Sequence, residues 1–168
     1  MERIVKTGAP RTRRFLAVSL LLGALVLVAQ PAAAAGRIFS ASGSFVQESF
    51  VQSNIRSADG VTLFDFTEHD SLAGTFSGTS VIEGSCVVRA SGQGVCQAFE
   101  TFSGTVESAS GTATFSDVVF LDLTTGAVHG TFTVVSGTGD LADLQGHGAF
   151  QGTSGAPGTY SGTLVFAP

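Results

Sequence analysis

Two acidic residues, Glu100 and Asp117, are the strongest candidates for chemistry in this sequence. Each lies in a segment that alternates apolar and polar residues, and each is two residues from a phenylalanine, Phe102 or Phe115. Alternate residues of a β-strand lie on one face of the sheet, so both carboxyls are predicted to project into an apolar interior. Two carboxyls held close together there cannot both ionise at low cost, which suits general acid–base catalysis or capture of a cation.

The pairing of these two carboxyls depends on the hairpin that joins their strands. If Glu107–Ser110 forms the turn, Glu100 lies directly opposite Asp117, and directly opposite residues share a face. A slip of one residue would move them to the other face. The alternative is that one or both carboxyls point to solvent, or pair with Arg89 or a threonine.

The elements that carry these residues are predicted to be strands, because period-two alternation and glycine-rich turns dominate and helical periodicity is scarce. Eight short strands of this kind predict an antiparallel sandwich or a closed barrel. The widest connections are Ser49–Gly60 and the segment around residue 140, so residues 36–60 are expected to be partly irregular. The predicted strands are Ile38–Glu48, Val61–Glu68, Leu72–Val88, Val95–Val106, Thr112–Leu121, Val128–Val135, His147–Gln151 and Thr159–Phe166.

The first 35 residues have the features of a secretory signal peptide. Five basic residues precede an apolar run, Phe15–Ala29, and Ala32–Ala35 offers small-residue cleavage sites. Twin-arginine export and an uncleaved anchor are the alternatives. Residues 36–168 then form one domain, predicted to be secreted and free of the membrane, with three arginines, twelve acidic residues and a net charge of −9. Such a charge excludes nucleic acid as a partner.

Two cysteines, Cys86 and Cys96, lie ten positions apart around the turn residues Ser91–Gly94. In an exported chain this spacing predicts a disulfide across a hairpin, with Ile82 opposite Glu100. A metal site or a catalytic thiol is the alternative, but no histidine lies nearby in the sequence.

The 14 phenylalanines predict how the interior is filled. They either fill the core or, if the interior is hollow, line a cavity for an apolar ligand, as barrels of eight strands allow. Phe76, Phe102 and Phe115 are the predicted ligand contacts. The predicted interior set is Phe64, Phe66, Phe76, Phe102, Phe115, Phe132 and Phe150.

The segment Ser136–Phe150, SGTGDLADLQGHGAF, interrupts the alternation. Asp140 is placed to cap a single helical turn, and the paired Leu141 and Leu144 are predicted to plug one end of the barrel. An acidic metal site at Asp140 and Asp143 is the alternative interpretation. The glycines of the segment are predicted to shape the chain on either side of this plug. Gly137 and Gly139 allow positive φ as the preceding strand ends, and Gly146 and Gly148 restart a strand at close quarters.

The pattern S-G-T-G-x-L-x-x-L-x-G-x-G-x-F of this segment resembles the bacterial DUF3224 family, within the allene oxide cyclase barrel-like group that also includes dirigent proteins. The resemblance extends over residues 72–166. It implies an all-β fold, a small eight-stranded antiparallel β-barrel, whose family function is not established. Dirigent-like barrels commonly associate, which implies a homo-oligomer.

The histidines give no stronger prediction. His129 and His147 flank the glycine-rich segment and could meet Asp140 or Asp143 around a divalent metal, but their spacing fits surface positions better. His69 is interpreted in the same way. We therefore expect no metal and no cofactor, and no serine-hydrolase elbow occurs in the sequence.

Together these features predict a secreted β-barrel of unestablished function. The preferred interpretation is a non-catalytic binding or structural module for a small hydrophobic ligand. The alternative is an isomerase or cyclase like the allene oxide cyclases, with Glu100 and Asp117 as its catalytic pair.

Overall fold

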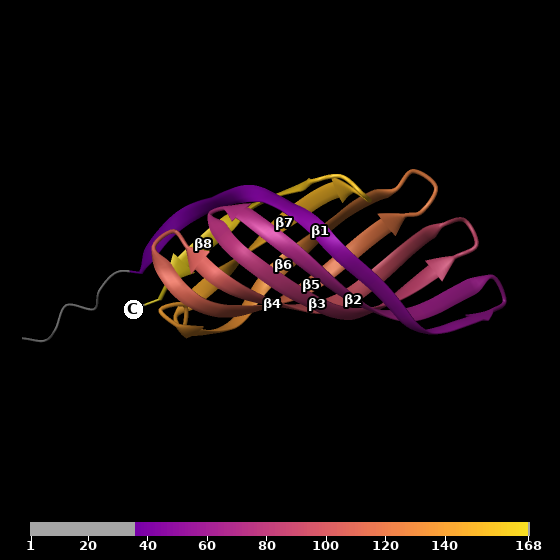
Figure 1. Ribbon diagram of the computed structural model, residues 1–168, viewed down its shortest axis with the longest axis horizontal. Coiled ribbons are helices and arrows are strands. Elements are labelled where there is room, and N and C mark those ends of the chain that lie inside the picture. Colours follow the sequence, from indigo (N-terminus) through magenta and orange to yellow (C-terminus); the bar gives the residue numbers. More distant parts are fainter. Residues whose placement is uncertain (1–35, 168) are drawn as a thin grey trace, which may run out of the picture. The chain divides into compact units, whose positions relative to one another are not determined.

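The computed structural model describes residues 36–167, which form eight antiparallel strands (Figure 1). Each strand pairs with the next along the chain, and β8 pairs with β1, so the sheet closes into a ring. Closure of this kind removes most of the free sheet edges that favour aggregation. The strands are β1 Arg37–Ala58, β2 Val61–Gly74, β3 Phe76–Arg89, β4 Gln93–Val106, β5 Ala109–Asp122, β6 Ala127–Gly139, β7 Leu144–Thr153 and β8 Gly158–Phe166.

The predicted signal peptide lies outside the described residues. Within residues 36–167, no helix is long and apolar enough to cross a membrane.

The first strand is longer than the sequence predicts. Residues 49–58, expected to be irregular, continue β1 and pair with β2. Two register shifts, between Gln47 and Ser49 and between Ser53 and Arg56, interrupt the alternation that reveals a strand. A second difference lies at Gly74, where the predicted strand Leu72–Val88 divides between β2 and β3.

One edge of β1 lacks a partner strand. Pairing with β8 covers Arg37–Phe45 alone, whereas β2 accompanies β1 as far as Ala58. The β1–β2 hairpin therefore projects past the closed part of the ring, at the right of Figure 1. Val46, Phe50 and Val51 are exposed along this stretch.

The core divides into two clusters, one toward each end of the ring. The first contains Phe76, Phe102 and Tyr160 with the two plug residues Leu141 and Leu144, and it fills the end where the β6–β7 turn lies. The second surrounds Cys86 and Cys96 toward the other end. The first cluster closes one end of the ring, which we call the closed end.

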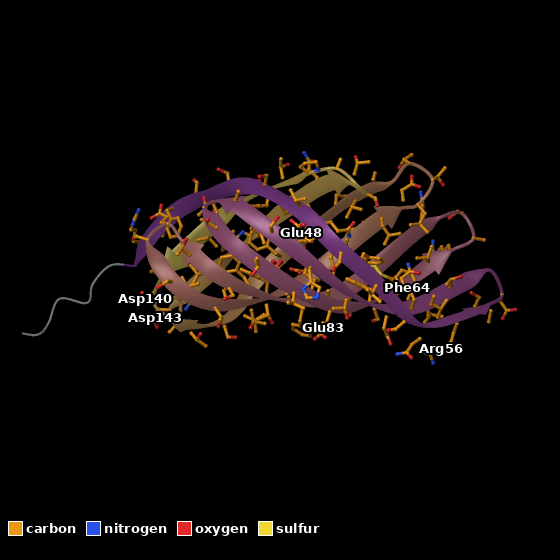
Figure 2. The ribbon with its side chains drawn as sticks, in the orientation of Figure 1. Glu48, Arg56, Phe64, Glu83, Asp140 and Asp143 are labelled. Carbon is orange, nitrogen blue, oxygen red and sulfur yellow. A yellow bond between two sulfur atoms is a disulfide. The ribbon has the colours of Figure 1, made fainter. Side chains whose placement is uncertain are left out.

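The turn at the closed end differs from the predicted helix. Residues 140–143 form consecutive turns, in which the Leu141 N–H donates to Thr138 O at 3.2 Å and the Leu144 N–H to Leu141 O at 3.1 Å. Asp140 caps no helix. Its carboxylate instead accepts a hydrogen bond from the Ser110 hydroxyl on β5 at 3.3 Å. Figure 2 shows Asp140 and Asp143 together at this end. Asp140 thus ties the turn to β5.

The glycines around this turn differ from the prediction at one position. Gly139 ends β6 at a φ of 64°, as expected, whereas Gly137 lies within β6 and is not among the residues with positive φ. Gly146 and Gly148 lie near the start of β7, as predicted.

Close approach of the backbone explains the glycines inside these strands. A Cβ at Gly137 would overlap the carbonyl oxygen of Leu141, and one at Gly146 would overlap the carbonyl oxygen of Thr163 on β8. Glycine within a strand commonly marks such an approach. Gly137 therefore lets the plug fold back against β6.

Aromatic side chains inside the ring lie directly opposite glycines of the neighbouring strand. Phe132 faces Gly148, and Phe150 faces Gly130. A Cβ at either glycine would overlap the ring that faces it. The same arrangement relates Phe45 to Gly158 and Tyr160 to Gly43. Because the glycines leave room, the rings lie along the wall instead of crossing the interior.

Candidate functional site

Four carboxyl side chains face the interior of the ring, which we call the lumen. Glu68 and Asp70 come from β2, Glu100 from β4 and Asp117 from β5, and all four line a single cavity. Each shares the inward face of its strand with apolar residues at a spacing of two, namely Phe66 and Leu72 beside Glu68 and Asp70, Ala98 and Phe102 beside Glu100, and Phe115 and Val119 beside Asp117. We call these four residues the carboxyl cluster.

The register of β4 and β5 corrects the predicted pairing of Glu100 and Asp117. Glu100 lies opposite Phe115, and Asp117 lies opposite Ala98. The turn consists of Glu107 and Ser108 alone, with Glu107 at a φ of 54°, so the register differs by two residues from a four-residue turn. A shift of two keeps every side chain on its face, so both carboxyls still point into the lumen.

The cavity has a volume of about 230 Å³. Aromatic rings form much of its wall, among them Phe66, Phe76 and Phe115. Of the predicted ligand contacts, Phe76 and Phe115 therefore line the cavity, whereas Phe102 is fully buried in the core of the closed end. The remaining aromatic lining residues are Phe45, Phe50, Phe132, Phe150 and Tyr160.

The cavity opens away from the closed end. Its exposed lining residues are Gln47 and Phe50 on β1, Thr153 at the end of β7 and residues 154–156 of the β7–β8 loop. Phe50 stacks on Phe66, with ring centroids 5.4 Å apart. The exposed lining residues form the mouth of the cavity.

Two members of the cluster have buried oxygens with no hydrogen-bond partner. Asp70 and Asp117 are 5% and 4% exposed, respectively. The Oδ1 atom of each aspartate has no hydrogen-bond partner, and neither does the Oγ atom of Ser80. Buried polar atoms are normally hydrogen-bonded, and an unpaired one costs about 1–3 kcal/mol. Atoms of this kind in a cavity wall point to a partner that a ligand or water supplies.

Burial keeps protons on these carboxyls. Loss of hydration, with a smaller contribution from Glu100, raises the pKa of Asp117 to about 8. The same loss of hydration, with the charge of Glu68 next in effect, raises the pKa of Asp70 to about 8. Near neutral pH these two groups are therefore mostly neutral acids.

The other two carboxyls follow the same trend. Burial raises the pKa of Glu100 to about 7, with a smaller contribution from the charge of Glu68. Burial also raises the pKa of Glu68, against the opposing hydrogen bond of Gln47. Asp70, Glu100 and Asp117 therefore exchange protons near neutral pH, which few carboxyls do.

No basic side chain neutralises the cluster within the described part of the chain. The ion pair found there joins Arg37 to Glu107 at the surface, at 2.7 Å. Arg56 and Arg89 are exposed, so Arg89 does not pair with Glu100 or Asp117. Figure 2 shows Arg56 pointing away from the ring.

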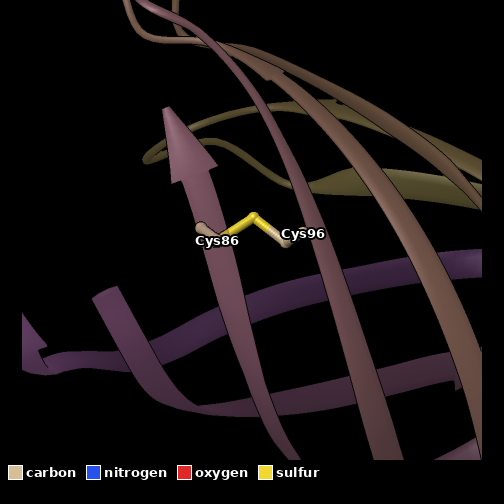
Figure 3. The surroundings of a disulfide bond; sticks show 2 residues. All are labelled: Cys86 and Cys96. Atoms are coloured by element: carbon tan, nitrogen blue, oxygen red, sulfur yellow. A yellow bond between two sulfur atoms is a disulfide. The ribbon is translucent and has the colours of Figure 1, made fainter. Parts of the chain in front are cut away.

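The disulfide between Cys86 and Cys96 forms part of the cavity wall. It joins β3 to β4 across the hairpin (Figure 3), with the two cysteines directly opposite and Ile82 opposite Glu100, as the spacing predicts. Both cysteines are buried, so the bond faces the lumen and not the solvent. It fixes the strand that carries Glu100.

Sequence reasoning missed Glu68 and Asp70. The predicted strand ended at Glu68, whereas β2 continues to Gly74. A partial signal was present, because Glu68 and Asp70 continue the two-residue spacing from Phe64 and Phe66 to Leu72, although residues 68–71 are all polar. Extending the strand by that rule would have placed both carboxyls inside.

The histidines do not join the site. His69, His129 and His147 are all exposed, and His129 stacks on Phe120 at the outer face, with ring centroids 5.4 Å apart. Among residues 36–167, no group of three or more histidine, cysteine or carboxylate side chains is arranged to hold a metal ion.

A closed ring of eight antiparallel strands, plugged at one end and open at the other into a carboxyl-bearing aromatic cavity, defines a small lumenal β-barrel. A family model described as "Protein of unknown function (DUF3224)" matches residues 41–164, so the chain belongs to that family.

A solved structure has the same fold. It is the crystal structure of a protein of unknown function from the DUF3224 family of Shewanella oneidensis MR-1, with a TM-score of 0.65 and 20% sequence identity. The match covers 79% of this chain and 99% of that one. No curated protein matches this chain.

Proposed function

We propose that this domain is a non-catalytic binding protein for a small, largely apolar ligand, which enters the lumen through the mouth. The observation that carries the proposal is the aromatic cavity of about 230 Å³, open at one end. Ligand sites are typically concave and largely apolar, with a few polar groups that orient the ligand. The carboxyl cluster supplies those groups.

The cavity limits the size of the ligand. A cavity of about 150 Å³ holds benzene, so the lumen suits a molecule moderately larger than one aromatic ring. A longer molecule would extend through the mouth, past Gln47 and Phe50.

The proposal includes export. The signal-like sequence of the first 35 residues and the Cys86–Cys96 disulfide both suit an oxidising compartment. N-terminal sequencing of protein from the culture medium tests it. A mature chain that begins near Gly36 is expected, and recovery of the whole protein inside the cell with residues 1–35 intact would contradict export.

A matched pair of variants tests ligand binding. Ile82 lines the cavity, whereas its neighbour Val81 is exposed on the outer face. We expect 2-phenylethanol to bind the wild type and Val81→Phe in saturation-transfer NMR, and to lose binding in Ile82→Phe, whose ring occupies the lumen. Circular dichroism checks that both variants fold. Equal binding by the two variants would place the ligand outside the lumen.

An isomerase or cyclase of the allene oxide cyclase kind is the second candidate. It rests on Glu100 and Asp117 facing one cavity with pKa values raised to about 7 and about 8, which suits proton donation near neutral pH. Membership of the allene oxide cyclase barrel-like group is part of this proposal. The small volume counts against a fatty-acid-sized substrate.

The cyclase candidate is tested with styrene oxide, a probe that fits the cavity. General-acid catalysis would open the epoxide and isomerise it to phenylacetaldehyde, with no atom gained or lost. Conversion that disappears in Asp117→Asn would support catalysis. Conversion no faster than in buffer would refute the cyclase candidate and leave binding as the remaining proposal.

A further inference from the structure

We propose that the ligand class is a small hydrophobic amine, whose ammonium group binds Asp70 and Asp117 while its apolar body lies against the aromatic wall. This inference rests on the proposed binding function and specifies its ligand. Two observations carry it, namely the unpaired buried oxygens and the lack of any cationic partner for the cluster in residues 36–167.

The unpaired oxygens define what the ligand must supply. Asp70 Oδ1 and Asp117 Oδ1 are acceptors once ionised, they are buried, and both residues line the cavity. An ammonium group has three donors and no acceptor, so it satisfies such oxygens without leaving a group of its own unpaired. A ligand carboxylate or phosphate would instead face four acidic side chains.

The lumen favours a cation over a neutral donor in two further ways. Positive charge is attracted to the faces of aromatic rings, and Phe66, Phe76 and Phe115 line the same cavity as the cluster. The domain carries a net charge of −9 from residue 36 onward, which raises the local concentration of cations at the mouth. An inorganic cation would be attracted by the negative charge but has no apolar part that could pack against the aromatic wall.

The protonation of the site predicts a pH dependence. The titratable groups that line the lumen with Asp70 and Asp117 are Glu68 from β2, Glu100 from β4 and Tyr160 from β8. Glu48 on β1 is exposed and accepts a hydrogen bond from the Ser71 hydroxyl at 2.7 Å, and its charge adds a small contribution at Asp70. The cavity-lining residues of β3, β6 and β7 contribute no group that titrates, since Cys86 is in the disulfide. Burial raises the pKa of both aspartates to about 8, so an ammonium ion must displace a proton from the cluster. Binding of an amine should therefore tighten as the pH rises from 6 to 8, by up to about tenfold per pH unit for one proton released.

The test uses two probes of the same shape, 2-phenylethylamine and 2-phenylethanol, which differ in an ammonium against a hydroxyl group. Isothermal titration of the wild type at pH 6, 7 and 8 should show tighter binding of the amine, by tenfold or more at pH 8, with a preference that grows with pH. In Asp117→Asn and Asp70→Asn the preference should fall by at least tenfold, while binding of the alcohol is retained. Glu83→Gln, on the exposed outer face of β3, should leave the preference unchanged.

The outcomes separate this inference from the proposed function. Binding of the alcohol with equal or weaker binding of the amine would overturn the amine inference and leave the binding proposal standing. Binding of neither probe would overturn both. An amine preference that persists in both aspartate variants would also overturn the inference, because the cation would then lie elsewhere.

Discussion

Replacement of Asp117 by asparagine should remove part of the pH dependence of the free energy of unfolding. Asp117 is 4% exposed, and burial raises its pKa from 3.8 to about 8. Below about pH 4, the folded and the unfolded chain both hold the proton. Between about pH 4 and pH 8, the folded chain holds it and the unfolded chain has lost it, so unfolding releases a proton.

The sign and size of the effect follow from this linkage. Release of a proton on unfolding lowers the free energy of unfolding of the wild type as the pH rises, by about 1.4 kcal/mol per pH unit. The asparagine side chain of the variant has no proton to release. From pH 5 to pH 7, the stability of Asp117→Asn relative to the wild type should therefore increase by about 3 kcal/mol, a large part of a typical domain stability.

Urea unfolding followed by far-ultraviolet circular dichroism at pH 5, 6 and 7 measures this difference. The asparagine resembles the protonated acid, so the two proteins should have similar stabilities at about pH 4 and below, and at pH 5 the variant should already be more stable by about 1–2 kcal/mol. Glu83→Gln serves as the control, since it removes a carboxyl from the exposed outer face and should parallel the wild type. A constant difference between Asp117→Asn and the wild type across this range would refute the argument that Asp117 is held as a neutral acid.

Three further predictions concern stability. Loss of the disulfide in the double variant Cys86→Ala, Cys96→Ala should lower the free energy of unfolding by about 3 kcal/mol, because the bond closes a loop of ten residues. Urea unfolding measures the loss, and dithiothreitol should lower the urea midpoint of the wild type but not that of the variant. Tyr160→Phe removes the hydroxyl that accepts the buried Phe76 N–H at 2.8 Å, so unfolding should need about 1–3 kcal/mol less free energy; an unchanged urea midpoint would contradict this role. Gly148→Ala places a methyl group against an aromatic ring and a carbonyl of neighbouring strands, and should cost about 1–3 kcal/mol with a lower thermal midpoint; retention of the wild-type midpoint would show that the ring moves freely.

The sequence predicts the face of a side chain better than its exact partner. The Cys86–Cys96 hairpin pairs as expected, because a short polar turn leaves one register that brings the cysteines opposite each other. The next hairpin differs by two residues, since its turn contains two residues and not four. That error leaves the lumenal positions of Glu100 and Asp117 intact, because the alternation of a strand repeats every two residues.

The rest of the site depends on contacts between distant segments. Pairing of β1 with β2 extends both strands beyond the range that local patterns indicate, and this extension brings Asp70 into the lumen. The cavity itself arises where glycines face rings from another strand, as Gly148 faces Phe132. A local pattern that predicts a close approach at Gly146 and Gly148 cannot show which strand each glycine meets, because that strand lies elsewhere in the sequence.

The pairing of lumenal rings with glycines has a consequence for how the size of the lumen can diverge among related proteins. A ring such as Phe150 and the glycine opposite it, Gly130, occupy one shared volume, so neither position can change freely while the other stays the same. A larger residue at the glycine requires a smaller one in place of the ring, and the two changes together move the wall without altering the strands. The volume of the lumen is therefore set by pairs of positions, and exchanging such pairs is a direct route to a lumen of altered size and shape.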